Sequence, residues 1–566
     1  MINLIQPNTD LWRFKEWASH QSILALDTET TGLDPRKDKI RLLTISNGQD
    51  TWIVDSRDIP VTCVFEDLYN KTLVGHNLLF DYSFLWQLGF YPTMLLFDTM
   101  LASQLVYAGL RDEKNKPLSH SLEACAKREL GFGLSKDLQK SDWDGQLTKE
   151  HYNYAAQDAQ ILISLHRSLQ HKINFFKLQQ VAEVEMRCLP AIIWMSNAGV
   201  PIDFNKWCYI ADGELFNAVD LEQTMNNEIR DILEEGEKVN WSSWQQVKKI
   251  FECIGIDLPN TAFETISQID HPLARLLTEY RERQKRISTY GRNWEQYICN
   301  GRIYPQWHQN FTATGRLSCS SPNMQNLPRL KQYRECIKAS LGRKLVVCDY
   351  SMIEVRIAAK LANEQRMIKA FQRGDDIHSL TAAIVLEKDV SQVTKAERQI
   401  GKSCVFCLIY GGGADKLRRY AQAQFKTHIS IEEATEYKKR FMTAYPGLTK
   451  WHRNIPQDSL NTKTLAGRHR LQVDKFTEKV NSPDQGSGAD MMKLALALLW
   501  ERRNECPASF PIMAVHDEIV LETIDSEADK AKEWVSRAMM DAAEWMLHPV
   551  LCAVEGSVCQ SWADKN

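Results

Sequence analysis

Short apolar runs that end in a carboxylate are the most informative pattern in this chain. Residues 345–347 (LVV) predict a buried strand that leads into Asp349. The residues that follow have helical spacing, with Ser351 as the expected N-cap and Glu354 three positions later, as in a capping box. A charged side chain at the end of a buried strand is unfavourable unless another group pairs with it.

A second pair of carboxylates, Asp517 and Glu518, lies between two apolar runs in the string VHDEIV. Divalent cations would neutralise such carboxylates. Phosphoryl-transfer enzymes use two ions, about 3.5–4 Å apart, to hold the attacking and leaving oxygens. We therefore predict that Asp349 and Asp517, from separate strands, converge on two metal ions.

The N-terminal part of the chain has the alternating pattern of a mixed α/β domain. Residues 22–26 predict a strand that leads into Asp27 and Glu29, whose spacing of two puts both carboxylates on one side of a strand. Residues 40–46 and 51–54 predict a hairpin with a short polar turn, which suits a mixed sheet.

Two later helical segments add further acids. Asp81 follows Asn77 by four positions, and Tyr154 and Asp158 share one helical face. The whole set resembles the motifs of the proofreading 3′–5′ exonucleases of the DEDD superfamily, in the subtype with a tyrosine in its last motif. Its members are Asp27, Glu29, Asp81, Tyr154 and Asp158.

This resemblance implies an RNase H-like fold in which the four carboxylates hold two divalent cations and Tyr154 orients the attacking water. It also implies that Leu33 and Asn77 contact the terminal nucleotide. Asp98 falls outside the family's metal set, so we interpret it as structural. Residues 131–145 are polar and glycine-rich and predict a flexible loop within the domain.

The middle of the chain is predicted to be nearly all helical, with helices at 181–198, 216–238, 241–256 and 273–290. The last of these helices carries a run of cations. Such a run is either a solvated face or, beside a nucleic-acid enzyme, a set of phosphate contacts. The run consists of Arg281, Arg283, Lys285 and Arg286.

Four residues spaced by four form a distinctive stripe in the C-terminal half, and three glycines follow it: Arg398, Lys402, Phe406 and Tyr410. This spacing puts cations and aromatic rings on one helix face. An ordinary amphipathic helix would separate polar from apolar faces. Cations suit phosphates and rings suit a sugar or base, so the face suits a nucleotide.

Together with the loop string TATGRLS, these features resemble the family A DNA polymerases, of the bacterial DNA polymerase I and phage type, over nearly the whole chain. The resemblance implies that Asp349 and Asp517 hold two Mg²⁺ ions per site, with Glu518 beside them as a third catalytic acid. It implies nucleotide binding by Arg398, Lys402 (also catalytic), His378, Phe406 and Tyr410, with Glu354 blocking a 2′-hydroxyl. It implies DNA contacts by Arg316, Gln485, Asn481 and His516.

The expected fold is multidomain, of the α/β and α+β classes. An RNase H-like exonuclease domain occupies residues 1–180, a linker and helical thumb 181–300, and the palm and fingers of a right-hand polymerase 301–566, with the fingers at about 365–450. We expect no 5′-nuclease domain within these 566 residues.

Three positions depart from the family pattern. Met352 replaces a polar residue, and Thr477 replaces an arginine, which predicts fewer primer-strand contacts. Phe406 in place of tyrosine predicts discrimination against dideoxynucleotides.

Composition changes this picture little. Hydrophobic content of 44%, charged content of 25% and a net charge of −3 are typical of an ordinary globular protein. The 14 cysteines form no framework, so Cys404 and Cys407 are expected to be buried helix residues, with zinc or redox use as the alternative. No signal peptide or membrane span is predicted. We therefore expect a cytoplasmic protein, in the host cytoplasm if it is phage-encoded.

The predicted activity is template-directed DNA synthesis with 3′–5′ proofreading in replication or repair. The expected partners are primer–template DNA, dNTPs and a processivity factor or replisome proteins. The protein is expected to be a monomer. Mn²⁺ is the expected substitute for Mg²⁺. Two alternatives stay open. One is a nuclease whose C-terminal half only holds DNA, which a primer-extension assay tests. The other is a replication scaffold that binds primer–template without turnover, which magnesium-dependent nucleotide turnover would exclude.

Overall fold

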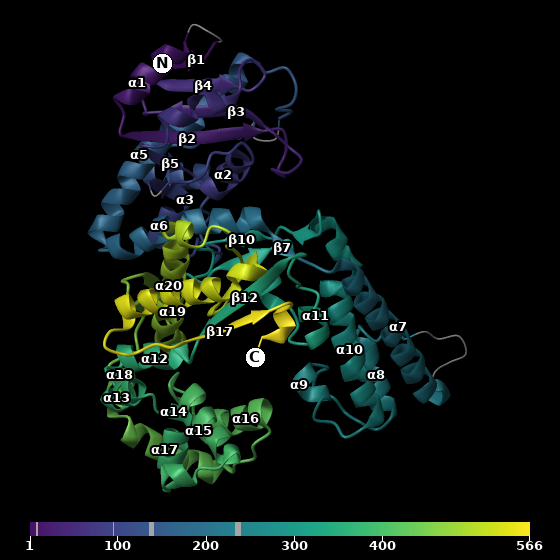
Figure 1. Ribbon diagram of the computed structural model, residues 1–566. Coiled ribbons are helices and arrows are strands. Elements are labelled where there is room, and N and C mark those ends of the chain that lie inside the picture. Colours follow the sequence, from purple (N-terminus) through teal and green to yellow (C-terminus); the bar gives the residue numbers. More distant parts are fainter. Residues whose placement is uncertain (7–9, 94, 135–137, 139–140, 233–238, 566) are drawn as a thin grey trace. The chain divides into compact units, whose positions relative to one another are not determined.

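The computed structural model describes residues 1–6, 10–93, 95–134, 138, 141–232 and 239–565 (Figure 1). They form two compact units. The first unit comprises Met1–Gly199, Gln306–Gln325 and Gly342–Val558, and the second comprises Val200–Pro305, Asn326–Leu341 and Cys559–Asn566. Because each unit draws on three separate stretches of chain, the division of the sequence at 180 and 300 stays a prediction. No helix in the described ranges has the length and apolar character needed to cross a membrane.

The N-terminal part of the first unit is a six-stranded mixed sheet in the order β1-β4-β3-β2-β5-β6. Its two antiparallel pairs are β2 with β3 and β3 with β4, and the predicted hairpin corresponds to β3 and β4. The strand predicted at 22–26 extends to Thr30 and so includes Asp27 and Glu29. The strands are β1 (Ile2–Leu4), β2 (Ile23–Thr30), β3 (Ile40–Ser46), β4 (Thr51–Asp55), β5 (Thr72–Gly75) and β6 (Leu96–Asp98).

Helices pack against this sheet and enclose an apolar core that includes Leu26, Leu43, Phe84 and Ile193. Helix α5 contacts four of the strands, and α6 contacts β6 and α2. Of the predicted loop at 131–145, residues 135–137, 139 and 140 lie outside the described residues. The helices are α1 (Leu11–Ser19), α2 (Leu78–Gln87), α3 (Thr99–Val106), α4 (Leu122–Leu130), α5 (Lys149–Phe175) and α6 (Gln179–Ala198).

A second sheet, in the order β15-β16-β12-β17, forms the centre of the C-terminal part of the first unit. Leu345, Val346 and Val347 of β12 are completely buried, as their apolar run predicted. Helix α20 packs on β12 and β16, while α19 packs against α20, α12 and α6 (Figure 1). These elements are β12 (Arg343–Tyr350), β15 (Phe510–Val515), β16 (Glu518–Ile524), β17 (Val554–Cys559), α12 (Ile353–Leu361), α19 (Phe476–Glu501) and α20 (Ala528–Leu547).

The chain between α12 and α19 is mainly a helical subdomain. Two short antiparallel pairs, β10 (Gln306–His308) with β11 (Ser318–Ser320) and β13 (Leu460–Lys463) with β14 (His469–Val473), complete the first unit. The helices are α13 (Gln365–Arg373), α14 (Ile377–Leu386), α15 (Lys395–Leu408), α16 (Ala414–Phe425), α17 (Ile431–Ala444) and α18 (Pro446–Arg453).

Two local predictions in this part are wrong. Helix α12 begins at Ile353, and its N-cap is Met352, with φ of 52° and no side-chain hydrogen bond to the helix, so Ser351 and Glu354 form no capping box. The amide of Ser351 instead donates to the Ala553 carbonyl at 2.9 Å. Helix α15 ends at Leu408, so Tyr410 lies just beyond the helix whose face it was expected to share.

The second unit is mainly helical, as predicted for most of its length. Helices α7 and α10 pack together over a core that contains Trp241, Phe251 and Leu277. Helix α7 starts earlier than the predicted 216–238, and residues 233–238 of that prediction lie outside the described residues. The elements are α7 (Phe204–Glu228), α8 (Trp244–Cys253), α9 (Phe263–Ile266), α10 (Pro272–Tyr290), α11 (Lys331–Arg334), and the sheet β7 (Val200–Pro201), β9 (Arg302–Ile303), β8 (Ile298–Cys299).

The cation run on α10 is partly neutralised. Arg283 and Arg286 both contact Glu214 of α7, at 3.1 and 3.2 Å. Arg281 donates to the Thr261 carbonyl. These contacts favour a structural role for the three arginines over the phosphate contacts considered above.

Helix α6 is held to the C-terminal part of the first unit by a fully buried ionic cluster. Glu185 of α6 accepts from Lys493 at 2.5 Å and also pairs with Arg468, which lies 2.7 Å from Asp490. None of the four side chains is more than 2% exposed. Burial alone would raise the pKa of Glu185, but Lys493 and Arg468 bring that pKa below its usual value.

Candidate active sites

The first candidate site combines one strand and two helices of the N-terminal part. Asp27 and Glu29 project from β2, and Asp81 lies in the first turn of α2. Tyr154 and Asp158 lie one turn apart on α5, where the tyrosine hydroxyl donates to the Asp158 carboxylate. The five residues that resemble an exonuclease motif set are therefore brought to one place by β2, α2 and α5.

Burial and mutual repulsion dominate the electrostatics of this site. Burial raises the pKa of Asp27 well above its usual range, and the charges of Asp81, Glu29 and Asp158 add to the increase. Burial, followed by Asp158 and Asp81, raises the pKa of Glu29 to about 9. Burial also raises the pKa of Asp81 to about 7, although the amide and hydroxyl of Thr28 donate to its Oδ1 at 3.0 and 2.7 Å. The pKa of Asp158 is about 6, again because of burial.

These carboxylates fit a divalent cation by their chemistry. Across the described part of the chain, no three His, Cys, Asp or Glu side chains already surround a point that could hold an ion, so binding would have to draw the acids closer together. Carboxylate oxygens are hard donors of the kind that Mg²⁺ prefers. A cation would also relieve the repulsion that raises their pKa values.

Asp98, which has the same sequence surroundings as a metal ligand, has a structural role. Its carboxylate caps α3 by accepting from the amides of Met100 and Leu101, at 2.8 and 3.1 Å. It also accepts from the amides of Asn77 and Leu78, at 3.2 and 2.7 Å. The interpretation of Asp98 as structural agrees with these contacts.

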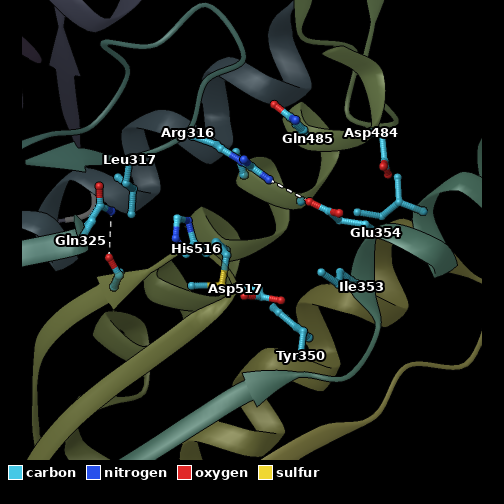
Figure 2. Close-up of a pocket in the computed structure, with 15 residues that line it drawn as sticks. Arg316, Leu317, Gln325, Tyr350, Ile353, Glu354, Asp484, Gln485, His516 and Asp517 are labelled. Atoms are coloured by element: carbon cyan, nitrogen blue, oxygen red, sulfur yellow. Dashed lines mark hydrogen bonds and ion pairs between the residues drawn. The ribbon is translucent and has the colours of Figure 1, made fainter. Parts of the chain in front are cut away.

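The second candidate site lies where β12 meets the β15–β16 hairpin. Asp349 stands opposite Glu518 in the strand register, and the Tyr350 amide donates to the Asp517 carbonyl at 3.2 Å. Figure 2 shows the Asp517 carboxylate beside Tyr350. The backbones of Asp349 and Asp517, distant in sequence, therefore lie next to each other, with Asp517 in the turn rather than on a strand. That their carboxylates share metal ions stays a prediction.

The turn that carries Asp517 has an unusual backbone. His516 and Asp517 are the two residues between β15 and β16, and His516 has φ of 57°, in the left-handed region that favours glycine. Two-residue hairpin turns need such a conformation to match the twist of the strands. Non-glycine residues held in this conformation occur preferentially at functional sites.

A cavity of about 380 Å³ opens in front of this turn (Figure 2). Arg316 donates from Nη2 to Glu354 Oε1 at 3.1 Å across it, and Gln325 donates to the Ala514 carbonyl at 2.9 Å. Six of its polar lining residues are Arg316, Glu354, Asp484, Gln485, His516 and Asp517.

Tyr410 connects two acids at the edge of this cavity. Its hydroxyl lies 2.9 Å from Glu354 Oε2 and 2.5 Å from Asp484 Oδ2. The hydrogen bonds of Glu354 are thus made to Tyr410 and Arg316 rather than to the start of its own helix. Burial raises the pKa of Asp484 well above its usual range, and the negative charge of Glu354 raises it further.

The residues predicted to bind a triphosphate are gathered on α14 and α15. Arg398 donates to Asp376 at 2.6 Å, and this bond keeps the Asp376 pKa at about 2 despite partial burial. His378 is buried, and burial together with the charges of Arg398 and Lys402 lowers its pKa to about 4. Its ring centroid lies 5.7 Å from that of Phe406. The structure therefore brings Arg398, Lys402 and His378 together beside Phe406, and Arg398 is bonded to Asp376.

Comparison with known proteins assigns the chain to a family. The family model described as 3′-5′ exonuclease matches residues 2–174, and the model described as DNA polymerase family A matches residues 217–564. The chain belongs to DNA polymerase family A. Its N-terminal 3′–5′ exonuclease domain precedes the polymerase domain, as the sequence predicted, and the family assignment argues against both alternatives considered there. Domains of these two families depend on metal ions, generally Mg²⁺.

Individual relatives agree with this assignment. DNA polymerase I of Aquifex aeolicus is 32% identical over 574 residues, covering 95% of each chain. The DNA polymerases I of Borreliella burgdorferi and Pseudomonas aeruginosa are 27% and 26% identical, and this family A chain spans 62% and 66% of their lengths. A solved structure of the polymerase domain of Pol1 from M. smegmatis, in complex with DNA primer-template and dNTP, matches 100% of both chains with a TM-score of 0.83 at 21% identity. At that identity the likeness concerns the fold.

Asp484 is the main residue of this family A site that sequence reasoning missed. It stands in the string NSPDQGSGAD next to Gln485, in a helix that is buried along most of its length. An acid among small, buried helix residues is the one sequence signal that marks it. Its contact with Tyr410, 74 positions away, has no local signature.

Proposed function

We propose that this family A polymerase extends primer 3′ ends from dNTPs on a DNA template, in replication or repair, and removes misincorporated nucleotides at its exonuclease site. The adjacency of Asp349 and Asp517 supports the polymerase assignment most directly, because two acids, one at the end of β12 and one in the β15–β16 turn, could share two cations. The carboxylates around β2 and α5 support proofreading in the same way.

Two Mg²⁺ ions per site are the proposed cofactors, with Mn²⁺ as a substitute. Asp349 and Asp517 would hold them in the polymerase site with Glu518 alongside, and Asp27, Glu29, Asp81 and Asp158 would hold them in the exonuclease site. When bound, the ions would supply charge stabilisation at phosphate and acidify the attacking oxygen. Tyr154, already bonded to Asp158, would orient the attacking water in the exonuclease. Leu33, which is 83% exposed, is available for contact with a terminal nucleotide, with Asn77 at the start of α2.

The nucleotide would bind along α15. Arg398, Lys402 and His378 would contact its triphosphate, which requires Arg398 to exchange Asp376 for phosphate, and Lys402 would also serve catalysis. Phe406 would pack on the sugar and base. Tyr410 would lie beside the templating base, and Glu354 would block a 2′-hydroxyl.

Four residues are the proposed DNA contacts near the primer end: Arg316, Gln485, Asn481 and His516. Arg316, Gln485 and His516 line the cavity that Asp517 also lines. Among the described residues, the buried Oδ1 atom of Asn481 has no hydrogen-bond partner, and a DNA donor would provide one. Primer–template DNA and dNTPs are the proposed partners, with a processivity factor or replisome proteins in addition, for a monomer that acts in the cytoplasm.

Separation of the two activities tests the proposal. Asp349→Ala should abolish primer extension and leave degradation of single-stranded DNA, while Asp27→Ala should do the reverse. Both are measured with end-labelled DNA and magnesium, and Asp529→Ala on α20, whose side chain is 88% exposed, serves as the matched acid-to-alanine control outside both sites. A variant that lost both activities while remaining folded would contradict two independent sites.

A further inference from the structure

The Tyr410 hydroxyl contacts two carboxyl groups, but its single proton can form a hydrogen bond to only one of them. The Tyr410 oxygen lies within hydrogen-bond distance of both Glu354 and Asp484, but a phenol donates only one proton. One of the two acids must therefore carry a proton and donate to the Tyr410 oxygen.

Asp484 is the acid that carries this proton. Its side chain is completely buried, whereas the Glu354 side chain is 35% exposed and paired with Arg316. Burial favours the neutral form of an acid, and an adjacent guanidinium favours the charged form. The other oxygen of Asp484, Oδ1, is buried and lacks a hydrogen-bond partner within the described residues, so a charge there would be uncompensated.

We propose that Asp484 is a positioning residue for sugar selection: as a neutral acid it donates to Tyr410, which donates to Glu354 and holds that carboxylate in the cavity. The resulting chain of hydrogen bonds runs from Asp484 through Tyr410 to Glu354, whose second oxygen accepts from Arg316. The inference rests on the proposed function of Glu354, since a carboxylate that excludes a 2′-hydroxyl acts only if its position is fixed.

Two substitutions at position 484 test this role. Asp484→Leu removes the donor, and Asp484→Asn retains one, because its amide group donates to the Tyr410 oxygen. We expect Asp484→Leu to raise kcat/KM for ribonucleotides about tenfold, mainly through a lower ribonucleotide KM, with kcat for deoxynucleotides nearly unchanged. Asp484→Asn should retain wild-type selectivity. Tyr410→Phe breaks the same chain at its centre and should lower the preference for deoxynucleotides over ribonucleotides by a similar factor, whether or not the leucine variant folds well.

Two results would overturn the inference. One is equal behaviour of the asparagine and leucine variants, and the other is a leucine variant that slows ribonucleotides and deoxynucleotides alike. Glu354→Ala is measured in parallel. If Glu354→Ala relaxes selectivity and Asp484→Leu does not, only the positioning role fails. If Glu354→Ala itself leaves selectivity unchanged, the function proposed for Glu354 fails.

A separate observation concerns a basic groove of about 660 Å³ between α17 and α18. Four cations line it, Lys438, Lys439, Lys450 and Arg453, and none of its lining residues is acidic. The sequence between Glu436 and Asp458 contains five Lys or Arg residues and no carboxylate. In the part of the chain that the structure describes, only Lys439 of the four has an acid within 4.0 Å, namely Glu436 at 3.8 Å.

This groove adjoins the end of α15. The His452 ring on α18 bonds to the Ile409 carbonyl at 2.8 Å, immediately before Tyr410. Besides burial, the positive charge of Lys438 influences the pKa of His452 and the pKa of Cys407 on α15. We infer that the groove binds the phosphate backbone of the unpaired template strand ahead of the templating base, an assignment that rests on the proposed place of that base beside Tyr410.

Overhang length tests this assignment. Lys450→Ala/Arg453→Ala should weaken binding of a primer–template whose overhang is about twelve nucleotides by roughly three- to tenfold. It should leave binding and extension with a single-nucleotide overhang unchanged. The slope of log K against log salt should fall by about 1.4 for two lost phosphate contacts. Lys369→Ala/Lys530→Ala, which removes two exposed cations elsewhere, is the matched control and should change neither.

Equal binding of the long overhang by the variant and the wild type would overturn the assignment, as would equal weakening on both templates. Either result leaves wild-type extension intact and so differs from a failure of the proposed polymerase function.

Discussion

Protons and divalent cations should compete at the exonuclease carboxylates. Without metal, burial and neighbouring acids raise the pKa of Glu29 to about 9 and that of Asp81 to about 7. At about pH 7, Glu29 is then roughly 1% ionised, and ionising it costs about 2.7 kcal/mol. Cation binding must meet that cost. Raising the pH to about 9, where Glu29 is about half ionised, should therefore strengthen binding about 50-fold through Glu29 alone.

The same shifts fix the sign of the effect on stability. Because the folded-state pKa values lie above the unfolded ones, the folded protein binds more protons than the unfolded chain. Without metal, the free energy of unfolding should therefore fall as the pH rises from about 4.5, the usual value for Glu29, towards its folded value of about 9. Added Mg²⁺ should restore stability, and by more at high pH than at low pH.

Calorimetric titration of the intact chain with Mg²⁺ or Mn²⁺ measures both quantities. Titrations in buffers of different ionisation enthalpy give the number of protons released, and thermal unfolding with EDTA or Mg²⁺ gives the stability. Subtracting data for Asp27→Ala removes the contribution of the polymerase site. Glu29→Gln should lose most of the pH dependence between about pH 7 and pH 9. Affinity that is independent of pH, with no protons released, would refute the argument.

Three further outcomes are expected. Glu354→Ala should admit ribonucleotides because no carboxylate then meets the 2′-hydroxyl; steady-state kinetics with each sugar measures this, and unchanged selectivity would contradict it. Phe406→Tyr should increase dideoxynucleotide incorporation, seen as earlier chain termination on sequencing gels, whereas identical termination patterns would remove that role from the ring. Glu185→Gln should lower the free energy of unfolding by about 3–5 kcal/mol because it leaves Arg468 and Lys493 buried with too little negative charge. In urea unfolding, Glu183→Gln on the same helix, 65% exposed, should change it by less than about 0.5 kcal/mol.

Local sequence patterns predicted the elements that carry the candidate sites well. Residues 345–347 before Asp349 could be recognised because a short apolar run next to a turn has few other structural solutions. The same holds for the spacing of Asp27 and Glu29 on β2. Family resemblance then connected acids that local patterns cannot pair.

Predictions failed where distant contacts decide the local structure. The Ser351–Glu354 spacing fits a capping box, yet Ser351 donates its amide to Ala553 and Glu354 bonds to Tyr410. Both partners lie more than fifty positions away, so no local pattern reports them. Asp484 went unnoticed for the same reason, since its meaning depends on a tyrosine from another helix end.

The buried Glu185 cluster has a practical consequence for anyone who trims this enzyme. A truncation that removes proofreading and starts after α6 would delete Glu185 and strand Arg468 and Lys493 in the interior with Asp490 as their nearest counter-charge. Such a shortened polymerase should express poorly or aggregate. A start point at or before Gln179 keeps the whole of α6, so the two buried cations keep two buried carboxylates as partners.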